Sequence, residues 1–227
     1  MDKNKIEANH YDIKVLNISS SDSSLTTDFV LRKAHLCYET SVKKILQQNR
    51  GGLILDYGCG IGIKNFQFTD TNWKIIGIDI SSKSIEIAKN MAIEKKVNAE
   101  YMVMDCEKMS FSNNSFDLII DYGAFSSLDI KLAVPDLIRV LKENGSLVAI
   151  ETLGHNFLTN AKRKLNVIRG KRTSWAENHI MKLKNWKYIA SHFKEVEIYY
   201  FGFFVLFLSP FIKRCPNNVL TLFERLD

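Results

Sequence analysis

The chain has little of what marks secreted, fibrous or membrane-spanning proteins. Three prolines in 227 residues and the lack of a low-complexity tract argue against long linkers. Its four cysteines (Cys37, Cys59, Cys106 and Cys215) form no C-x-x-C pair, which argues against a disulfide framework or a metal site. The most apolar run, 199–211, is shorter than the roughly 20 residues of a spanning helix. We therefore expect a cytoplasmic protein with no transmembrane segment and no metal.

The net charge of +6 originates in one segment, residues 162–172, which holds six basic residues and no acid. Such a local patch indicates an anionic substrate or surface beside one site. Arg163 and Arg172 are candidates to bind phosphate or carboxylate, because arginine contacts these groups with two hydrogen bonds. The alternative is a solvated helix face. Nucleic acid is disfavoured as a partner because aromatic residues interleave poorly with these charges.

Apolar runs that end in glycine or aspartate alternate with helical patterns along most of the chain. This rhythm predicts an α/β, Rossmann-like, doubly wound and mostly parallel sheet of six to seven strands. The predicted strands are Gly52–Tyr57, Lys74–Ile80, Glu100–Asp105, Phe116–Asp121, Ser146–Thr152 and Glu195–Phe201. A seventh strand is supplied by 202–208 or follows residue 227.

Four parts are expected along the chain. Residues 1–50 form an N-terminal helical lid segment, including a helix over Leu25–Gln48, and 51–154 form the nucleotide-binding core. Residues 155–192 form a small helical cap between strands five and six, with two amphipathic helices. Residues 193–227 supply the last strand or strands and the C-terminal segment. The aromatic stretch near 201–208 leaves a homodimer open.

A glycine-rich turn follows the first predicted strand and is preceded by Asp56. Gly58, Cys59, Gly60, Ile61 and Gly62 give the spacing G-x-G-x-G, in which glycine permits positive φ and close approach of a ligand. The dinucleotide pattern G-x-G-x-x-G requires glycine at position 63, where this chain has Ile63. The turn therefore predicts a nucleotide-like ligand but disfavours a nicotinamide or flavin.

Acidic residues also end the second and third predicted strands. Asp79 can accept both hydroxyls of a ribose, and its charge would repel a 2′-phosphate. Asp105 can accept from an adenine amine, while the backbone N–H of Cys106 reaches the ring. Together these residues predict an unphosphorylated adenosine.

The chain resembles class I S-adenosylmethionine-dependent methyltransferases, in the group similar to ubiquinone and menaquinone methyltransferases. The resemblance covers residues 50 to 156 and rests on LILDYGCGIG (53–62), IIGIDIS (75–81), the segment 101–120 and the segment 137–156. It implies S-adenosylmethionine as cofactor, with the acid and glycines of the turn beside its methionine part. It also implies that Ile80 packs on adenine and that Asp121 and Tyr122 lie beside the sulfonium. Many relatives carry two histidines where this chain has Ser126 and Ser127, so a base there is not implied.

Candidates for the acceptor side lie near the ends of strands four and five and in the cap. His155 is either a general base or substrate ligand, or only a hydrogen-bonding residue at a helix entry. Glu151 either orients His155, binds substrate or caps a turn. The remaining substrate-binding candidates are Tyr11, Asn156, Arg163, Arg172 and His179.

The predicted activity is transfer of a methyl group to a polar small molecule, including one that bears phosphate or carboxylate. A sugar or a phosphorylated intermediate of surface-polysaccharide or secondary metabolism fits this description. The first alternative is an RNA or protein methyltransferase that docks through residues 162–172. The second is a nucleotide-binding oxidoreductase.

Overall fold

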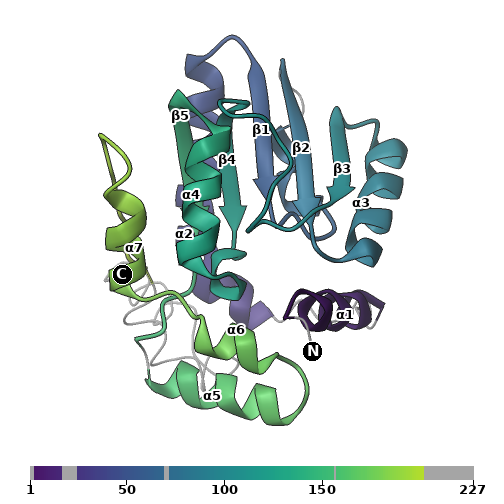
Figure 1. Ribbon diagram of the computed structural model, residues 1–227, viewed down its shortest axis with the longest axis vertical. Coiled ribbons are helices and arrows are strands. Elements are labelled where there is room, and N and C mark those ends of the chain that lie inside the picture. The colour runs from purple at the N-terminus through teal and green to yellow at the C-terminus, as the bar shows by residue number, and fades with distance from the viewer. Residues whose placement is uncertain (1–2, 17–24, 69–71, 156, 202–227) are drawn as a thin grey trace.

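The computed structural model describes residues 3–16, 25–68, 72–155 and 157–201. Its centre is a parallel sheet in the order β3-β2-β1-β4-β5 (Figure 1). The strands are β1 (Gly52–Tyr57), β2 (Trp73–Asp79), β3 (Ala99–Val103), β4 (Phe116–Tyr122) and β5 (Leu141–Ile150). All four pairings are parallel. This confirms the Rossmann-like α/β fold.

Helices cover both faces of the sheet. They are α1 (Lys3–Leu16), α2 (Leu25–Gln48), α3 (Ser82–Lys95), α4 (Ile130–Val140), α5 (Phe157–Ile168), α6 (Ser174–Asn178) and α7 (Leu183–Ala190), with 3-10 turns at Ile63–Phe68 and Phe125–Ser127. Alternate residues of each strand face opposite layers. Ile54 and Leu118 pack with α2, whereas Leu55 and Ile119 pack with α4 and α7. The central strands are therefore apolar on both faces, as a covered parallel sheet requires.

Helices α1, α5 and α6 lie at the carboxyl ends of the strands, below the sheet in Figure 1. Asp12 fastens α1 to the start of α3. It accepts hydrogen bonds from Ser81 Oγ at 2.5 Å and from the backbone N–H of Lys83 at 3.0 Å. Lys3, at the other end of α1, forms an ion pair with Glu107. These contacts place one helix across the edge where ligands bind in such sheets.

The predicted strand over Glu195–Phe201 is wrong. The described sheet has five strands, and residues 195–201 adopt no regular structure. Val196, Ile198 and Tyr200 alternate as in a strand, but their side chains are exposed. Alternation shows which side chains share a face, whereas a strand also needs an edge to pair with. The candidate strand at 202–208 lies outside the described residues.

The segment 155–192 contains α5, α6 and α7 in place of two helices. The second predicted helix is interrupted, because α6 ends at Asn178 and α7 begins at Leu183. A role for these helices as a substrate cap remains a prediction, as does the division into four parts. None of the described helices combines the length and apolar character needed to cross a membrane.

Candidate active site at the carboxyl edge of the sheet

The glycine turn after β1 is open to a cavity at Gly60. Gly58, Gly60 and Gly62 have φ of +68°, +53° and +75°, a region that favours glycine. A Cβ at Gly62 would lie 2.7 Å from Tyr101 Oη, and one at Gly58 would lie 2.4 Å from the Ala124 Cβ. A Cβ at Gly60 would meet nothing within 4 Å. Two of the glycines are thus needed for packing, and the third exposes its backbone to a ligand.

Asp79, at the end of β2, is held by backbone donors and lines the same cavity. Its Oδ2 accepts from the Gly60 N–H at 2.9 Å and its Oδ1 from the Ser81 N–H at 2.8 Å. Burial raises the pKa of Asp79, and these two hydrogen bonds oppose the shift. A carboxylate has about four acceptor sites. Each oxygen of Asp79 therefore retains capacity for one ribose hydroxyl.

Asp105 and Cys106, which follow β3, form the next part of the cavity wall together with Ile80. Asp105 Oδ1 accepts from the Glu107 N–H at 2.8 Å, and Oδ2 accepts from Asn4 Nδ2 at 2.6 Å. An amide of α1 thus already donates to the carboxylate that we expect to accept from an adenine amine. Burial raises the pKa of the Cys106 thiol well above its ordinary value, so it is a neutral group.

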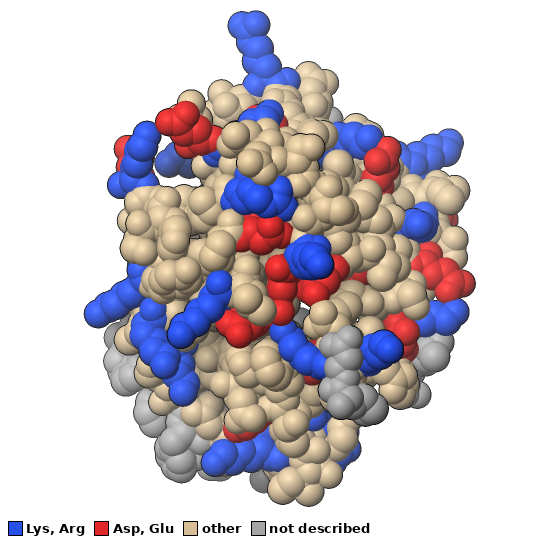
Figure 2. Space-filling view, viewed as in Figure 1, with Lys and Arg blue, Asp and Glu red and all other residues tan. Residues whose placement is uncertain are grey.

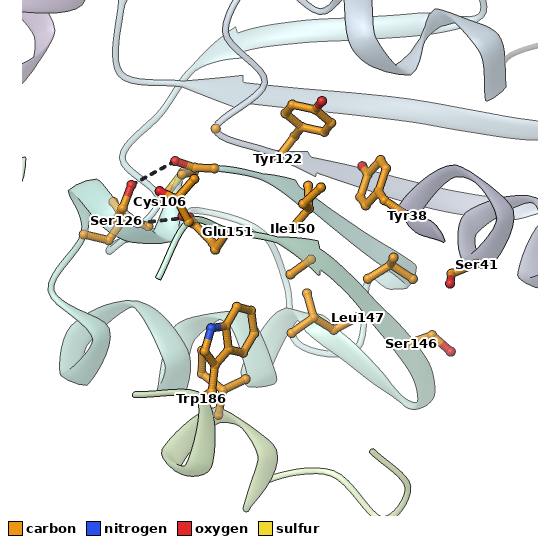
Figure 3. A pocket seen from close by; sticks show the side chains of 18 of the residues that line it. Tyr38, Ser41, Cys106, Tyr122, Ser126, Ser146, Leu147, Ile150, Glu151 and Trp186 are labelled. Carbon is orange, nitrogen blue, oxygen red and sulfur yellow. Dashed lines mark hydrogen bonds between the residues drawn. The ribbon is translucent and has the colours of Figure 1, made fainter. Parts of the chain in front are cut away.

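Two carboxyl groups are buried at the ends of β4 and β5. Asp121 Oδ1 accepts from the Ala124 N–H at 2.9 Å. Glu151 Oε1 accepts from the Ser126 N–H at 3.0 Å, and Figure 3 shows Glu151 beside Ser126 with Tyr122 nearby. Asp121 Oδ2 and Glu151 Oε2 are buried and have no hydrogen-bond partner among the described residues. Asp121 is therefore kept from water by the loop that follows β4, whereas Glu151 is part-buried and also lines the cavity.

Some predicted cofactor residues lie behind the cavity wall. Asp56 is 1% exposed, and neither it nor Cys59, Gly62 or Asp121 is among the described lining residues. The side chain of Asp56 instead receives a hydrogen bond from Asn65, and burial raises its pKa to about 7. Gly58, Gly60, Asp79, Ile80, Asp105, Cys106 and Tyr122 do line the cavity.

The acceptor-side candidates separate into two groups. Tyr11, Glu151, His155, Arg163 and Arg172 line the cavity. His179 does not. Its ring stacks on Trp175 with centroids 3.7 Å apart, and its Nδ1 lies 2.9 Å from the Trp175 carbonyl oxygen, which indicates a packing role. Asn156 lies outside the described residues.

Sequence reasoning missed all of the α1 residues that line the cavity except Tyr11. Asn4, Glu7 and Lys14 share one face of the helix with Tyr11, and all four line the cavity. Tyr11 Oη lies 2.9 Å from Ser127 Oγ, and both carboxylate oxygens of Glu7 are buried without a hydrogen-bond partner in the described part of the chain. The spacing of three or four residues was a signal that could have found this face.

The geometry fits S-adenosylmethionine. The open backbone at Gly60 allows close approach of a ligand. The acceptor capacity of Asp79 suits a ribose, and the carboxyl groups at the ends of β4 and β5 suit a ligand with a positive sulfur. Since each of these groups lies at the end of a different strand, the sheet itself sets their relative positions.

Comparison with known proteins agrees with this geometry. Residues 54–145 match the model of a methyltransferase domain family. A demethylmenaquinone methyltransferase of Lactococcus lactis is 31% identical over 144 residues, covering 61% of this chain and 57% of that protein. The uncharacterized methyltransferase YcgJ of Bacillus subtilis is 32% identical over 100 residues, covering 43% of this chain and 40% of that protein. The chain thus spans about half the length of these curated relatives.

Two solved structures show the same fold. The protein PH0226 of Pyrococcus horikoshii has a TM-score of 0.50 at 28% identity, covering 61% of this chain and 62% of that one. The YcgJ protein of Bacillus subtilis has a TM-score of 0.59 at 24% identity, covering 69% of this chain and 67% of that one. Residues 54–145 thus match a methyltransferase domain, and the chain is similar to methyltransferases that act on small molecules, with S-adenosylmethionine as the cofactor that this similarity indicates.

Proposed function

We propose that this chain transfers the methyl group of S-adenosylmethionine to a small polar acceptor that carries a carboxylate or phosphate. The observation that carries the proposal is a cluster of three cations at the mouth of the cavity. Lys14 comes from α1, Arg163 from α5 and Arg172 from the segment before α6. All three line both the large cavity and a smaller pocket beside it.

The cations of this cluster are placed at an electrostatic cost. Burial lowers the pKa of Lys14, and the charge of Arg172 lowers it further. Burial and the charge of Arg172 also lower the pKa of Arg163. Lys14 is exposed, whereas Arg163 and Arg172 are part-buried. Like charges brought together favour an anion between them. The cluster therefore suits an anionic group better than a neutral one.

Arg172 has a donor that supports this reading. Its Nη2 donates to the Ala176 carbonyl oxygen at 2.7 Å. Its Nε is buried and has no hydrogen-bond partner within the described residues. A buried donor without a partner is costly, and an anionic oxygen would satisfy it.

The predicted residue roles belong to this proposal. Asp79 holds the ribose, Asp105 and Cys106 hold the adenine edge, and Gly58 and Gly60 approach the methionine part. His155 is exposed at the cavity and is assigned as a substrate ligand. The names of two relatives, a demethylmenaquinone methyltransferase and a ubiquinone biosynthesis O-methyltransferase, favour an organic small-molecule acceptor.

The test is a panel of acceptors in matched pairs, each a carboxylate or phosphate and its neutral amide or hydroxyl analogue. We expect higher kcat/KM for the anionic member. Arg172→Gln should raise the KM for that member by about tenfold or more, the range for a lost charge-assisted hydrogen bond. It should leave S-adenosylhomocysteine affinity unchanged. Lys164→Gln, which changes an exposed residue on α5, is the matched control. Equal kcat/KM for charged and neutral members would contradict the anionic part of the proposal.

The second candidate is an RNA or protein methyltransferase that docks through residues 162–172. Basic side chains do lie over α5, at the lower end of the face in Figure 2. Lys164 and Arg169 are exposed, whereas Arg163 and Arg172 are part-buried and line the cavity. Because the inward pair leaves fewer charges for a docking surface, we favour the small molecule. Substrate affinity that falls steeply with salt, at a slope matching several phosphates, would favour the second candidate.

A further inference from the structure

The buried carboxyls of Asp121 and Glu151 lie on the same side of the sheet. In the β4–β5 register Tyr122 pairs with Ile150. Asp121 immediately precedes Tyr122 in β4, and Glu151 immediately follows Ile150 at the end of β5. Successive side chains of a strand alternate between faces, which places both on the face opposite Tyr122 and Ile150. Burial raises the pKa of Asp121, and the charge of Glu151 raises it further, so the two groups interact. The strand ends thus bring two acids together out of water.

The loops hold one oxygen of each acid and leave the other without a donor. The N–H groups of Ala124 and Ser126 donate to Asp121 Oδ1 and Glu151 Oε1. Asp121 Oδ2 and Glu151 Oε2 remain buried and unsatisfied by any described residue. Two adjacent carboxylates in a dry site cannot both ionise, so such a pair retains one proton. A retained proton would also satisfy one of the two free oxygens.

The groups around the pair are mostly neutral. Tyr57 of β1 and Cys106 after β3 lie within range of the charge of Asp121, and burial raises the pKa of each well above its ordinary value. On the other face, burial raises the pKa of Tyr38 of α2 as well. The cation facing Glu151 is Arg163 of α5, whose charge interacts with it. The exposed imidazole of His155 lies four residues along the chain and lines the same cavity.

We propose that the Asp121–Glu151 pair accepts the proton of a hydroxyl group on the methyl acceptor. Glu151, which lines the cavity, is the catalytic residue that contacts the acceptor, and Asp121, which lies behind it, is a positioning residue that holds the shared proton. This inference rests on the proposed methyltransferase function and deepens it, because an amine or carbanion acceptor has less need of a base.

The step balances in atoms and electrons. The acceptor O–H bond breaks and its proton moves to the carboxylate of Glu151. A lone pair of that oxygen forms the new bond to the methyl carbon, while the bond between this carbon and sulfur breaks. The electron pair of the broken bond stays on sulfur, which changes from a sulfonium to a neutral thioether. The pair then holds two protons and releases one to water.

Burial places the pKa of Glu151 in a range in which the group can act as a general base near neutral pH. It raises the pKa of Glu151 to about 7, against the opposing hydrogen bond from the Ser126 N–H. A base is most effective when its pKa lies near the operating pH. Ser126 and Ser127 follow β4 in this chain, and the N–H of Ser126 donates to Glu151. The pair therefore supplies a base where the chain has no imidazole.

The first test is the pH dependence of turnover with an acceptor from the matched panel. The wild-type kcat/KM should rise with pH through about 7 as the doubly protonated pair loses one proton and keeps the shared one. Glu151→Gln should lower kcat about a hundredfold or more, the range for a lost general base. It should leave S-adenosylhomocysteine affinity unchanged, which also verifies folding. Glu94→Gln, an exposed change on α3, is the control and should behave as wild type.

Two further variants separate a catalytic from a structural role. Glu151→Asp should restore part of the lost rate and keep a pH-dependent profile. Asp121→Asn should move the acid limb of the profile to higher pH, because the Glu151 carboxylate loses the carboxylic O–H with which it shares a proton. A structural role for Asp121 would lower activity without moving the limb.

A measurement on the protein alone makes the inference independent of the acceptor. Carboxyl carbon NMR of protein labelled in Asp and Glu should show a resonance that titrates near pH 7 and is lost in Glu151→Gln. Titration of that resonance below pH 5, or wild-type turnover of Glu151→Gln, would overturn the proposal. Equal use of charged and neutral acceptors, with turnover still lost in Glu151→Gln, would reject the anionic substrate and leave the pair standing.

Discussion

Ionisation of the buried Asp56 carboxyl destabilises the folded chain, so removing this charge should raise the free energy of unfolding at high pH. The residue is 1% exposed at the end of β1, and its Oδ2 has no hydrogen-bond partner among the residues described. Burial is the main cause that raises its pKa from 3.8 to about 7, and the charge of Asp79 adds to the shift. An acid with a raised pKa binds its proton more tightly in the folded than in the unfolded chain. Stability is therefore lost as the pH rises from about 4 to about 7.

The magnitude follows from the size of the shift. A change of about three pKa units corresponds to about 4 kcal/mol, as an upper estimate for the cost of ionising Asp56 in the folded chain. Asp56→Asn removes the charge and keeps an oxygen that can accept from Asn65. We expect the free energy of unfolding of this variant to exceed that of wild type by up to about 4 kcal/mol at pH 8.5. The two proteins should be equal below about pH 4.

The assay is urea unfolding followed by tryptophan fluorescence at several pH values. The slope against urea should be the same in both proteins, since both expose the same surface on unfolding. Glu86→Gln is the control, because Glu86 is exposed in an ion pair with Lys83 and such pairs contribute little. A stability difference for Asp56→Asn that does not change between pH 4 and pH 8.5 would refute the reasoning, since only a buried titrating charge gives that window.

Two further changes test the assigned residues. Asp79→Ala removes the acceptor of two backbone N–H groups and of the proposed ribose bonds, so S-adenosylhomocysteine affinity should fall about tenfold or more in calorimetry; unchanged affinity would reject the ribose role. His155→Ala should raise the acceptor KM and affect turnover far more than cofactor affinity, without moving the pH profile. Wild-type turnover would remove His155 from the mechanism.

The core of the fold could be predicted because its signals are local. β1 occupies Gly52–Tyr57 and α2 occupies Leu25–Gln48, as predicted, since an apolar run and a helical period are each contained in one short segment. The strand predicted over Glu195–Phe201 failed for the opposite reason. A strand forms only when its backbone pairs with a neighbouring strand. The alternation of apolar and polar residues within one segment does not show whether such a partner is available.

The sequence predicted which residues lie at the strand ends, but it predicted less well which of their side chains point into the cavity. Asp56 and Asp79 both end strands, yet Asp79 lines the cavity and Asp56 lies behind it. Strand ends are visible in the sequence, but the face on which a side chain emerges depends on register. Glu7 and Lys14 were missed because they belong to α1. The position of this helix over the sheet depends on contacts between Asp12 and residues about 70 positions later in the sequence, Ser81 and Lys83.

The two ends of the site carry opposite charge and come from different parts of the fold. Acids at the strand ends form the inner part, where a positive sulfur is expected, whereas the cations of α1, α5 and the segment before α6 form the mouth. Elements outside the sheet can change without disturbing it, so we expect the strand ends to determine the cofactor and the mouth to determine the acceptor. Helix α1 reaches both, because Asn4 contacts Asp105 and Lys14 lies close to Arg172. We therefore infer that a single helix couples the two halves of the site, and that the position of α1 affects cofactor and acceptor binding together.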